Sequence, residues 1–207
     1  MNQSIEIIFL IMAAYLLGSV PTGYLMGRVF CGVDIRQKGS GNIGATNTFR
    51  VLGMGYGIVT MILDIAKGML AVKLLIWATL EPSPLILLLA GLAAILGHIF
   101  PIFLGFQGGK GVATAAGVFI ILIPIPSLIA LVTFLLVIAV SGIISLGSLS
   151  AITALLISVL VINIQNGFRE AEYLIFVFVA FLVIFIRHRQ NIRRFLQGEE
   201  RKIKIKR

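Results

Sequence analysis

The chain has 207 residues, of which 59% are hydrophobic and only 12% are charged, whereas a soluble domain carries roughly 25% charged residues. This composition excludes a soluble globular protein and predicts an integral membrane protein, because too few polar side chains are available to face water. The net charge of +9 does not indicate nucleic acid binding, because basic residues are expected at the cytoplasmic surface of a membrane.

Seven apolar segments have the approximate length of a membrane-spanning helix, which needs about 17–25 residues. In chain order they are 5–27, 53–80, 85–104, 112–125, 127–144, 149–165 and 172–186. We therefore expect an all-α bundle of about seven short transmembrane helices, forming one membrane-embedded domain over 1–207 with a flexible basic tail at 199–207. Five or six spans remain an alternative, because Pro124 and Pro126 also fit a kink within one bent element.

The distribution of basic residues predicts the orientation of the bundle. Most of the 17 Lys and Arg residues lie in connections that share one side with the C-terminal tail. The opposite side holds mainly acidic residues. By the positive-inside rule, the C-terminus is cytoplasmic and the N-terminus lies outside. The single cysteine, Cys31, allows no internal disulfide, and no Cys/His spacing predicts a metal site.

The first connection contains a polar, glycine-rich segment, Gly39-Ser-Gly-Asn-Ile-Gly-Ala-Thr-Asn-Thr-Phe-Arg50. It contains the spacing GxGxxG, but no strand precedes the glycines, so we reject a dinucleotide site. A glycine-rich loop that opens a helix presents N–H groups and hydroxyls to an anion, and Arg50 adds a bidentate partner for an oxyanion. We prefer anion binding to the alternative, a plain polar turn.

A second glycine-rich segment, Gly105-Phe-Gln-Gly-Gly-Lys-Gly-Val-Ala-Thr114, resembles a phosphate loop. It is not a Walker A motif, because Leu104 stands where the first glycine belongs and Gly111 stands where Ser or Thr would bind magnesium. Nucleotide hydrolysis is therefore not predicted. Glycines around Lys110 still allow the backbone to approach a phosphate closely, and the alternative is a helix-ending turn with a snorkelling lysine.

The last polar segment, His188-Arg-Gln-Asn-Ile-Arg-Arg-Phe-Leu-Gln-Gly-Glu199, directly follows the final apolar segment. His188 and Asn191 are three residues apart and share one helix face. An amphipathic basic helix lying on anionic lipid is the alternative interpretation.

Charged and polar residues also lie inside the apolar segments. Asp64 and Lys67 are three residues apart, and we expect a structural ion pair rather than a proton relay, because isolated charges in a membrane are costly. His98 is interpreted as a core histidine. Ser19-Val-Pro21 predicts a helix kink.

Three segments, GSGNIGATNTFR, GHIFPIFLGFQGGKGVAT and HRQNIRRFLQGEE, resemble the three signature motifs of the bacterial acyl-phosphate:glycerol-3-phosphate acyltransferases, the PlsY family. LDIAKG at 63–68 also resembles a family pattern. The resemblance implies that a fatty acyl group passes from acyl phosphate to the 1-hydroxyl of glycerol 3-phosphate, giving lysophosphatidic acid and phosphate in phospholipid biosynthesis. It further implies a multi-pass protein of the bacterial cytoplasmic membrane, whose active site faces the cytoplasm.

The resemblance also implies the partners and the site. The partners are glycerol 3-phosphate, a long-chain acyl phosphate and membrane lipid, with no cofactor, no metal and no obligate protein partner. The residues assigned to catalysis are Ser40, Arg50, Lys110, His188 and Asn191. The residues assigned to substrate binding are Gly39, Gly41, Asn42, Thr46, Asn47, Gly108, Gly109, Gly111, Ser145 and Ser148.

Two groups are candidates for the base: His188 and an oxygen of the acyl phosphate itself. We favour the substrate-assisted route without a covalent acyl-enzyme, because no carboxylate in the sequence is obviously placed to orient His188. Two other functions remain as alternatives. A transporter or channel for a small phosphate ester would need polar groups on both faces and at the midplane, and a structural membrane subunit would bind anionic lipid through its tail.

Overall fold

The computed structural model describes residues 3–79 and 81–203, and within these ranges every regular element is a helix and there are no strands. Within the described ranges, the seven apolar segments are helical over most of their lengths, which confirms the predicted all-α class. The chain divides into two compact units, Met1–Leu122 and Ile123–Arg207, called unit 1 and unit 2. The expectation of a single domain stays a prediction.

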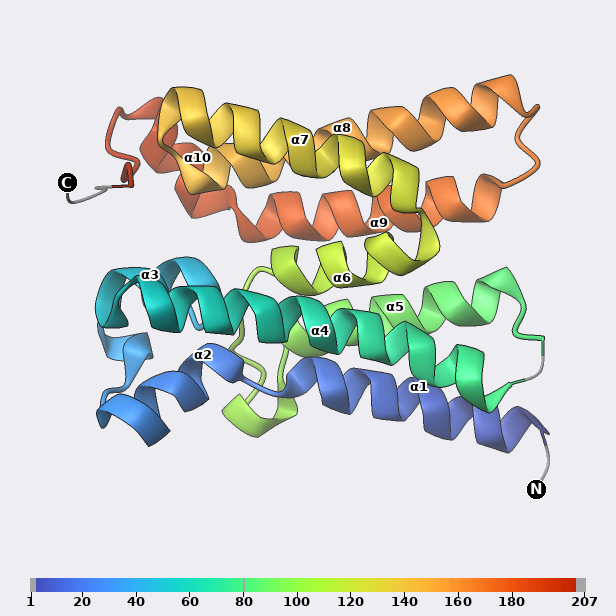
Figure 1. Ribbon diagram of the computed structural model, residues 1–207, viewed down its shortest axis with the longest axis horizontal. Helices are drawn as coiled ribbons and strands as arrows, with labels where there is room; N and C mark the ends of the chain where they lie inside the picture. The colour runs from blue at the N-terminus through green and yellow to red at the C-terminus, as the bar shows by residue number, and fades with distance from the viewer. Residues whose placement is uncertain (1–2, 80, 204–207) are drawn as a thin grey trace. The chain divides into compact units, whose positions relative to one another are not determined.

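The described residues of unit 1 form six helices and three short helical turns. They are α1 (Gln3–Ser19), α2 (Thr22–Leu25), the turn η1 (Met26–Phe30), the turn η2 (Ile35–Gln37), α3 (Ala45–Leu52), α4 (Met54–Ala78), α5 (Pro84–Ile99), the turn η3 (Ile102–Leu104) and α6 (Val112–Leu122). Helix α1 packs against α4 and α5, and α6 packs against α4 (Figure 1).

The predicted kink after α1 is confirmed. Helix α1 ends at Ser19, and the helical segment Thr22–Phe30 continues at an angle of 42°. Pro21 lies at this break, where it lacks the N–H that would continue the helix. At the break, the carbonyl oxygen of Val20 accepts hydrogen bonds from the N–H of Thr22 at 3.0 Å and from Nζ of Lys67 in α4 at 2.9 Å.

Small residues let the helices of unit 1 cross closely. A Cβ placed on Gly18 of α1 would lie 2.1 Å from the carbonyl oxygen of Ala94 in α5, and one on Gly68 of α4 would lie 2.1 Å from that of Thr114 in α6. Helices in lipid associate through such backbone packing, because burial in hydrocarbon gives no hydrophobic driving force between them. The core beside these crossings is built from Ala14, Ala71, Leu75, Ala90 and Ala94.

Unit 2 contains α7 (Pro124–Ser141), α8 (Ile144–Gln165), α9 (Ala171–Arg187) and α10 (Arg189–Leu196). Helix α8 packs against α7 and α9 (Figure 1). Helix α10 turns away from α9 by 57°. His188 lies at this bend, between the two helices.

Three helical stretches within the described residues are long and apolar enough to cross a membrane, namely Pro84–Leu104, Pro124–Ser141 and Ile144–Gln165, and five are if each of two bent pairs is one span. Helix α6 has only 11 residues, which is shorter than a typical span. These helices are those of a multi-pass membrane protein. The expected number of about seven spans and the expected orientation stay predictions.

Candidate functional site

Asn47 organises the first glycine-rich loop, residues 39–44, which leads into α3. Its side chain is almost fully buried, at 1% exposure. The Nδ2 group donates to the carbonyl oxygens of Ile35 at 2.9 Å and Lys38 at 3.2 Å, while Oδ1 accepts from the N–H of Ser40 at 2.7 Å. The Asn47 side chain therefore makes three of the four hydrogen bonds available to an amide. All three go to main-chain groups of this loop or of the turn before it, so Asn47 stabilises the loop conformation.

We expect Asn47→Asp to destabilise the protein by about 3 kcal/mol, because a buried carboxylate would face two carbonyl oxygens that now receive hydrogen bonds. Thermal unfolding of the purified protein in detergent measures this effect. Asn42→Asp is the matched control, because Asn42 uses only its Oδ1 in the described contacts, accepting from the N–H of Gly44 at 2.8 Å. Equal destabilisation by both substitutions would contradict this role of Asn47.

Two glycines of the first loop are required by its backbone. Gly39 and Gly41 have φ angles of +66° and +72°, in the left-handed region that favours glycine. A Cβ on Gly39 would also lie 2.2 Å from Oδ1 of Asn47. Among the predicted polar residues near this loop, Ser40 is exposed, whereas Thr46 and Arg50 are half-buried.

Asp34 anchors the chain before the first loop, and the sequence analysis did not identify it. Its carboxylate accepts hydrogen bonds from Nε of Arg36 at 3.0 Å and Nη2 at 2.7 Å, and Arg28 lies 3.6 Å away. The Arg36 hydrogen bond holds the pKa of Asp34 down at about 2, so Asp34 stays ionised. The guanidinium of Arg36 also lies 4.6 Å from the centre of the Tyr24 ring. The sequence signal was an isolated acid among several bases.

The second glycine-rich loop, residues 105–111, folds back onto the end of α5. The N–H of Gly109 donates to the carbonyl oxygen of His98 at 3.0 Å. A Cβ on Gly109 would lie 2.0 Å from Nε2 of His98, and one on Gly108 would lie 2.3 Å from the carbonyl oxygen of His98. Gly111 has a φ angle of +81°. The half-buried Lys110 therefore sits in a backbone turn that only glycine neighbours allow.

Four buried polar side chains, those of Thr22, Asp64, Lys67 and His98, form a cluster beside this loop, called the buried polar cluster. The carbonyl oxygen of Val20 borders it and accepts a hydrogen bond from Lys67. Nζ of Lys67 lies 2.9 Å from Oδ1 of Asp64, which confirms the predicted ion pair. The hydroxyl of Thr22 donates to the same oxygen, and Nδ1 of His98 lies 3.6 Å from it. His98 is 4% exposed, so its prediction as a core residue is also confirmed.

The buried polar cluster connects the two glycine-rich loops of unit 1. At one end, Gly23 follows Thr22, and a Cβ on Gly23 would lie 2.1 Å from the carbonyl oxygen of Ile43 in the first loop. At the other end, His98 contacts Gly109 of the second loop. The turn η3, within the chain that leads to the second loop, lies beside α1 (Figure 1). The buried polar cluster and the residues next to it therefore contact both of the loops that hold predicted site residues.

The third motif lies in unit 2, where His188 is buried at 2% exposure. Nδ1 of His188 lies 2.8 Å from the carbonyl oxygen of Ile184. A carbonyl oxygen only accepts hydrogen bonds, so Nδ1–H of His188 is the donor in this contact. Asn191 is also buried, and its Nδ2 group donates to Oε1 of Glu200 at 2.6 Å.

Glu200 is the main residue of unit 2 that the sequence analysis missed. Its carboxylate accepts hydrogen bonds from Ser145 Oγ at 2.7 Å, Asn191 Nδ2 at 2.6 Å and Arg194 Nε at 2.8 Å. Burial acts to raise the pKa of Glu200, but the hydrogen bonds from Arg194, Asn191 and Ser145 lower it overall. The only sequence signal was a pair of acids in a strongly basic tail.

These contacts bear on the expectations for the serines and the tail. The hydroxyl of Ser145 donates to Glu200, and that of Ser148 donates to the carbonyl oxygen of Ile144 at 3.0 Å. The substrate-binding role of both serines stays a prediction. The N–H of Ile203 donates to the carbonyl oxygen of Gly142 at 2.8 Å, so the part of the expected flexible tail up to 203 is attached to unit 2. Residues 204–207 lie outside the described ranges.

We expect Glu200→Gln to lower the stability of the protein by about 2 kcal/mol at neutral pH, because a charged acceptor strengthens its hydrogen bonds. The folded-state pKa of Glu200 is lowered from its ordinary value of 4.5, so its stabilisation is complete above that unfolded pKa and is lost as the pH falls through the folded value. Melting temperatures of wild type and variant, measured across this pH range, should converge in acid. Glu199→Gln, at an exposed neighbour, is the control; a gap that persists in acid would contradict the expectation.

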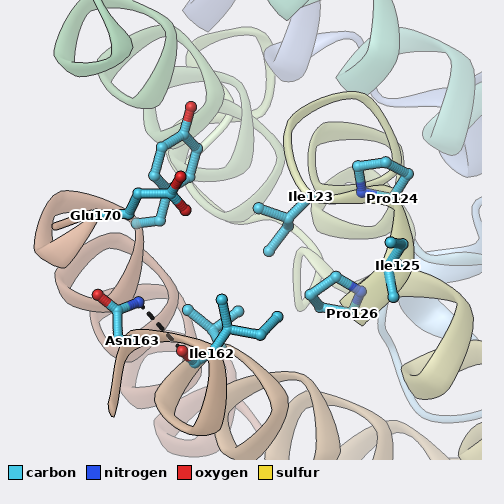
Figure 2. A pocket seen from close by; sticks show the side chains of 9 residues that line it. Ile123, Pro124, Ile125, Pro126, Ile162, Asn163 and Glu170 are labelled. Atoms are coloured by element: carbon cyan, nitrogen blue, oxygen red, sulfur yellow. Dashed lines mark hydrogen bonds between the residues drawn. The ribbon is translucent and has the colours of Figure 1, made fainter. Parts of the chain in front are cut away.

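A pocket of about 180 Å³ in unit 2 lies between the beginning of α7, the end of α8 and the beginning of α9. Pro124 and Pro126 lie on one side of it and Asn163 and Glu170 on another (Figure 2). His188 lies at the opposite end of α9, so this pocket is separate from the third motif.

Comparisons with known proteins agree with the motifs. A family model described as glycerol-3-phosphate acyltransferase matches residues 8–198. The chain is 42% identical to a glycerol-3-phosphate acyltransferase of Listeria welshimeri over 98% of this chain and 99% of the relative. It is 45% identical to one of Trichlorobacter lovleyi over 95% of this chain and 97% of the relative.

Solved structures are also similar to this chain. One is a crystal structure of PlsY (YgiH), an integral membrane glycerol 3-phosphate acyltransferase, in its glycerol 3-phosphate form. It has a TM-score of 0.86 and 36% identity, and the match covers 96% of each chain. The lysophosphatidic acid form of that protein has a TM-score of 0.84 with the same identity and coverage.

Proposed function

Since the chain belongs to the glycerol-3-phosphate acyltransferase family, we propose that it transfers a fatty acyl group from a long-chain acyl phosphate to the 1-hydroxyl of glycerol 3-phosphate. The products are lysophosphatidic acid and phosphate. The observation that carries the proposal is the pair of glycine-rich loops and their half-buried cations, joined by the buried polar cluster. Lys110 lies within the second loop, and Arg50 lies in α3, the helix that follows the first loop.

The chemistry requires two phosphorylated molecules to lie close together despite their mutual repulsion. Arg50 and Lys110 supply positive charge for this, and the glycines at 108, 109 and 111 allow close backbone approach to a phosphate. Ser40, Asn42 and Thr46 are the groups that would position phosphate or hydroxyl oxygens. Acyl phosphates are already activated, so orientation and charge neutralisation are the main tasks left to the protein.

We propose a substrate-assisted reaction. The 1-hydroxyl oxygen of glycerol 3-phosphate attacks the carbonyl carbon of the acyl phosphate, and the bond from that carbon to the phosphate oxygen then breaks. The hydroxyl proton passes to an oxygen of the departing phosphoryl group, which leaves as phosphate. No acyl-enzyme forms. His188 and Asn191 act as binding groups, and Nε2 of a neutral His188 would accept a hydrogen bond from a substrate hydroxyl.

Replacement of His188 separates binding from base catalysis. We expect His188→Ala to raise the KM for glycerol 3-phosphate about tenfold, the cost of one lost hydrogen bond, while turnover at saturation remains measurable. Steady-state kinetics with each substrate varied in turn measures both parameters. If turnover is abolished while both substrate affinities are unchanged, His188 is the base and the substrate-assisted route is wrong.

The donor is tested by comparing palmitoyl phosphate with palmitoyl-CoA in assays of the purified protein in detergent. We expect lysophosphatidic acid only with palmitoyl phosphate. Formation from palmitoyl-CoA alone would overturn the proposed donor. Uptake of glycerol 3-phosphate into proteoliposomes without acylation would instead favour a transporter.

We also propose that the protein lies in the bacterial cytoplasmic membrane with about seven spans, a cytoplasmic C-terminus and an external N-terminus, so that the site faces the cytoplasm. The basic segments that follow η1 and α9 support this orientation. Accessibility of tags at the two ends in intact cells tests it, and a cytoplasmic N-terminal tag would contradict it.

A further inference from the structure

The buried polar cluster takes no direct part in the reaction proposed above, yet it adjoins the loop that carries Lys110. We propose that His98, held in place by Asp64, is a positioning residue that seats the backbone of Gly108 to Lys110 and so determines where the Lys110 ammonium lies. This inference rests on the proposed function, because it concerns how a phosphate-holding loop is kept in its working position.

His98 supports the loop through both its main chain and its ring. Its carbonyl oxygen accepts a hydrogen bond from Gly109 N–H at 3.0 Å. The three atoms nearest to a Cβ placed on Gly109 would be ring atoms of His98, namely Nε2 at 2.0 Å, Cδ2 at 2.8 Å and Cε1 at 3.0 Å. Real Cβ atoms do not approach other atoms so closely, so the ring directly underlies Gly109 and a side chain there would force the two apart.

The opposite side of the ring faces the carboxylate. Nδ1 of His98 lies 3.6 Å from Oδ1 of Asp64. That oxygen is in turn held by Nζ of Lys67 at 2.9 Å and by the hydroxyl of Thr22. Asp64 is 1% exposed and His98 4%, so the ring is enclosed by packing, with the carboxylate beside it. A side chain fixed in this way is a firm support for a neighbouring functional group.

The neighbouring Gly108 is the control position, because a side chain there would not meet the His98 ring. A Cβ on Gly108 would meet the carbonyl oxygen of His98 at 2.3 Å, Cδ of Pro101 at 2.4 Å and the carbonyl oxygen of Ile99 at 2.7 Å. None of these atoms belongs to the imidazole ring. Truncating His98 therefore removes the obstacle to a methyl group at Gly109 but leaves the obstacle at Gly108.

The experiment introduces Gly109→Ala and Gly108→Ala separately into three backgrounds: wild type, His98→Ala and His98→Asn. The Asn variant keeps a donor that can face Asp64 while it withdraws ring atoms from Gly109, and it serves if the Ala variant folds poorly. For every variant, kcat and both KM values are measured with palmitoyl phosphate and glycerol 3-phosphate, and the melting temperature and helical content are recorded.

We expect His98→Ala alone to raise the KM for at least one phosphorylated substrate about tenfold, with a smaller change in kcat, because the loop loses its preorganisation. His98→Asn should retain more of the wild-type affinity. Gly109→Ala should lower kcat/KM about a hundredfold in wild type, but by only about threefold in the two His98 backgrounds, since contacting residues are not additive. Gly108→Ala should be equally damaging in all three.

If the wild type is active but Gly109→Ala lowers kcat/KM equally in all three backgrounds, this inference is wrong while the proposed function stands. Relief of Gly108→Ala to the same extent would also overturn the inference, because the effect would then be general loosening of the fold. If the folded wild type acylates glycerol 3-phosphate with neither palmitoyl phosphate nor palmitoyl-CoA, the proposed function and this inference are both wrong.

Discussion

Replacing Lys110 with alanine is expected to lower kcat/KM for acylation of glycerol 3-phosphate by about 10³-fold, which is the effect of removing one oriented donor from a developing anion. Lys110 is the cation of a loop whose backbone packs against His98. The reaction brings two phosphorylated substrates together, so the loss of this charge affects their binding and the departure of phosphate alike. Steady-state kinetics in detergent measures the effect.

Two further variants define the role of the lysine charge. Lys110→Arg keeps the positive charge but changes its shape, and should recover part of the lost activity. Lys73→Ala removes a lysine whose ammonium lies 5.9 Å from the centre of the Trp77 ring, and it should change activity by less than about twofold. Near-normal rates for Lys110→Ala would remove this residue from the site.

Asp64→Ala is expected to have the largest effect on stability, with a loss of about 3–5 kcal/mol, because it leaves a buried lysine without its counter-charge. Lys67 would keep only the carbonyl oxygen of Val20, 2.9 Å from its Nζ, among the partners described here. For a chain of this size the loss corresponds to a fall in melting temperature of about 10 °C. Thermal unfolding of the purified protein in detergent measures it.

The double variant Asp64→Ala with Lys67→Met is the control for that interpretation. It removes both charges and leaves an apolar side chain of similar length, so it should be more stable than Asp64→Ala alone. If the double variant is less stable than the single one, the ion pair is not the reason for the effect.

Local patterns predicted the helices and several contacts. The apolar segments became helices because hydrophobic runs of this length have few other structures open to them in lipid. The pairing of Asp64 with Lys67 followed from their spacing on one helix face. The bend after Ser19 followed from Pro21, which breaks the backbone hydrogen-bonding pattern.

Contacts between distant segments were not predictable in the same way. Glu200 bonds to Ser145, 55 residues earlier, and no local pattern indicates where a tail folds back. Asn47 was predicted to bind substrate because it lies in a polar, glycine-rich segment. Its hydrogen bonds to the carbonyl oxygens of Ile35 and Lys38 depend on how the preceding turn folds, which the sequence pattern does not show. The contact between His98 and Gly109 joins residues that are near in sequence, yet only the folded turn shows that the ring lies under the loop.

The most direct test follows both products of a single reaction containing palmitoyl phosphate and glycerol 3-phosphate. The proposed chemistry predicts one phosphate released for each lysophosphatidic acid formed, with no palmitoyl adduct on the intact protein at any time. In Lys110→Ala both products should form about 10³-fold more slowly at subsaturating substrate. Release of phosphate with free palmitate instead of lysophosphatidic acid would contradict acyl transfer.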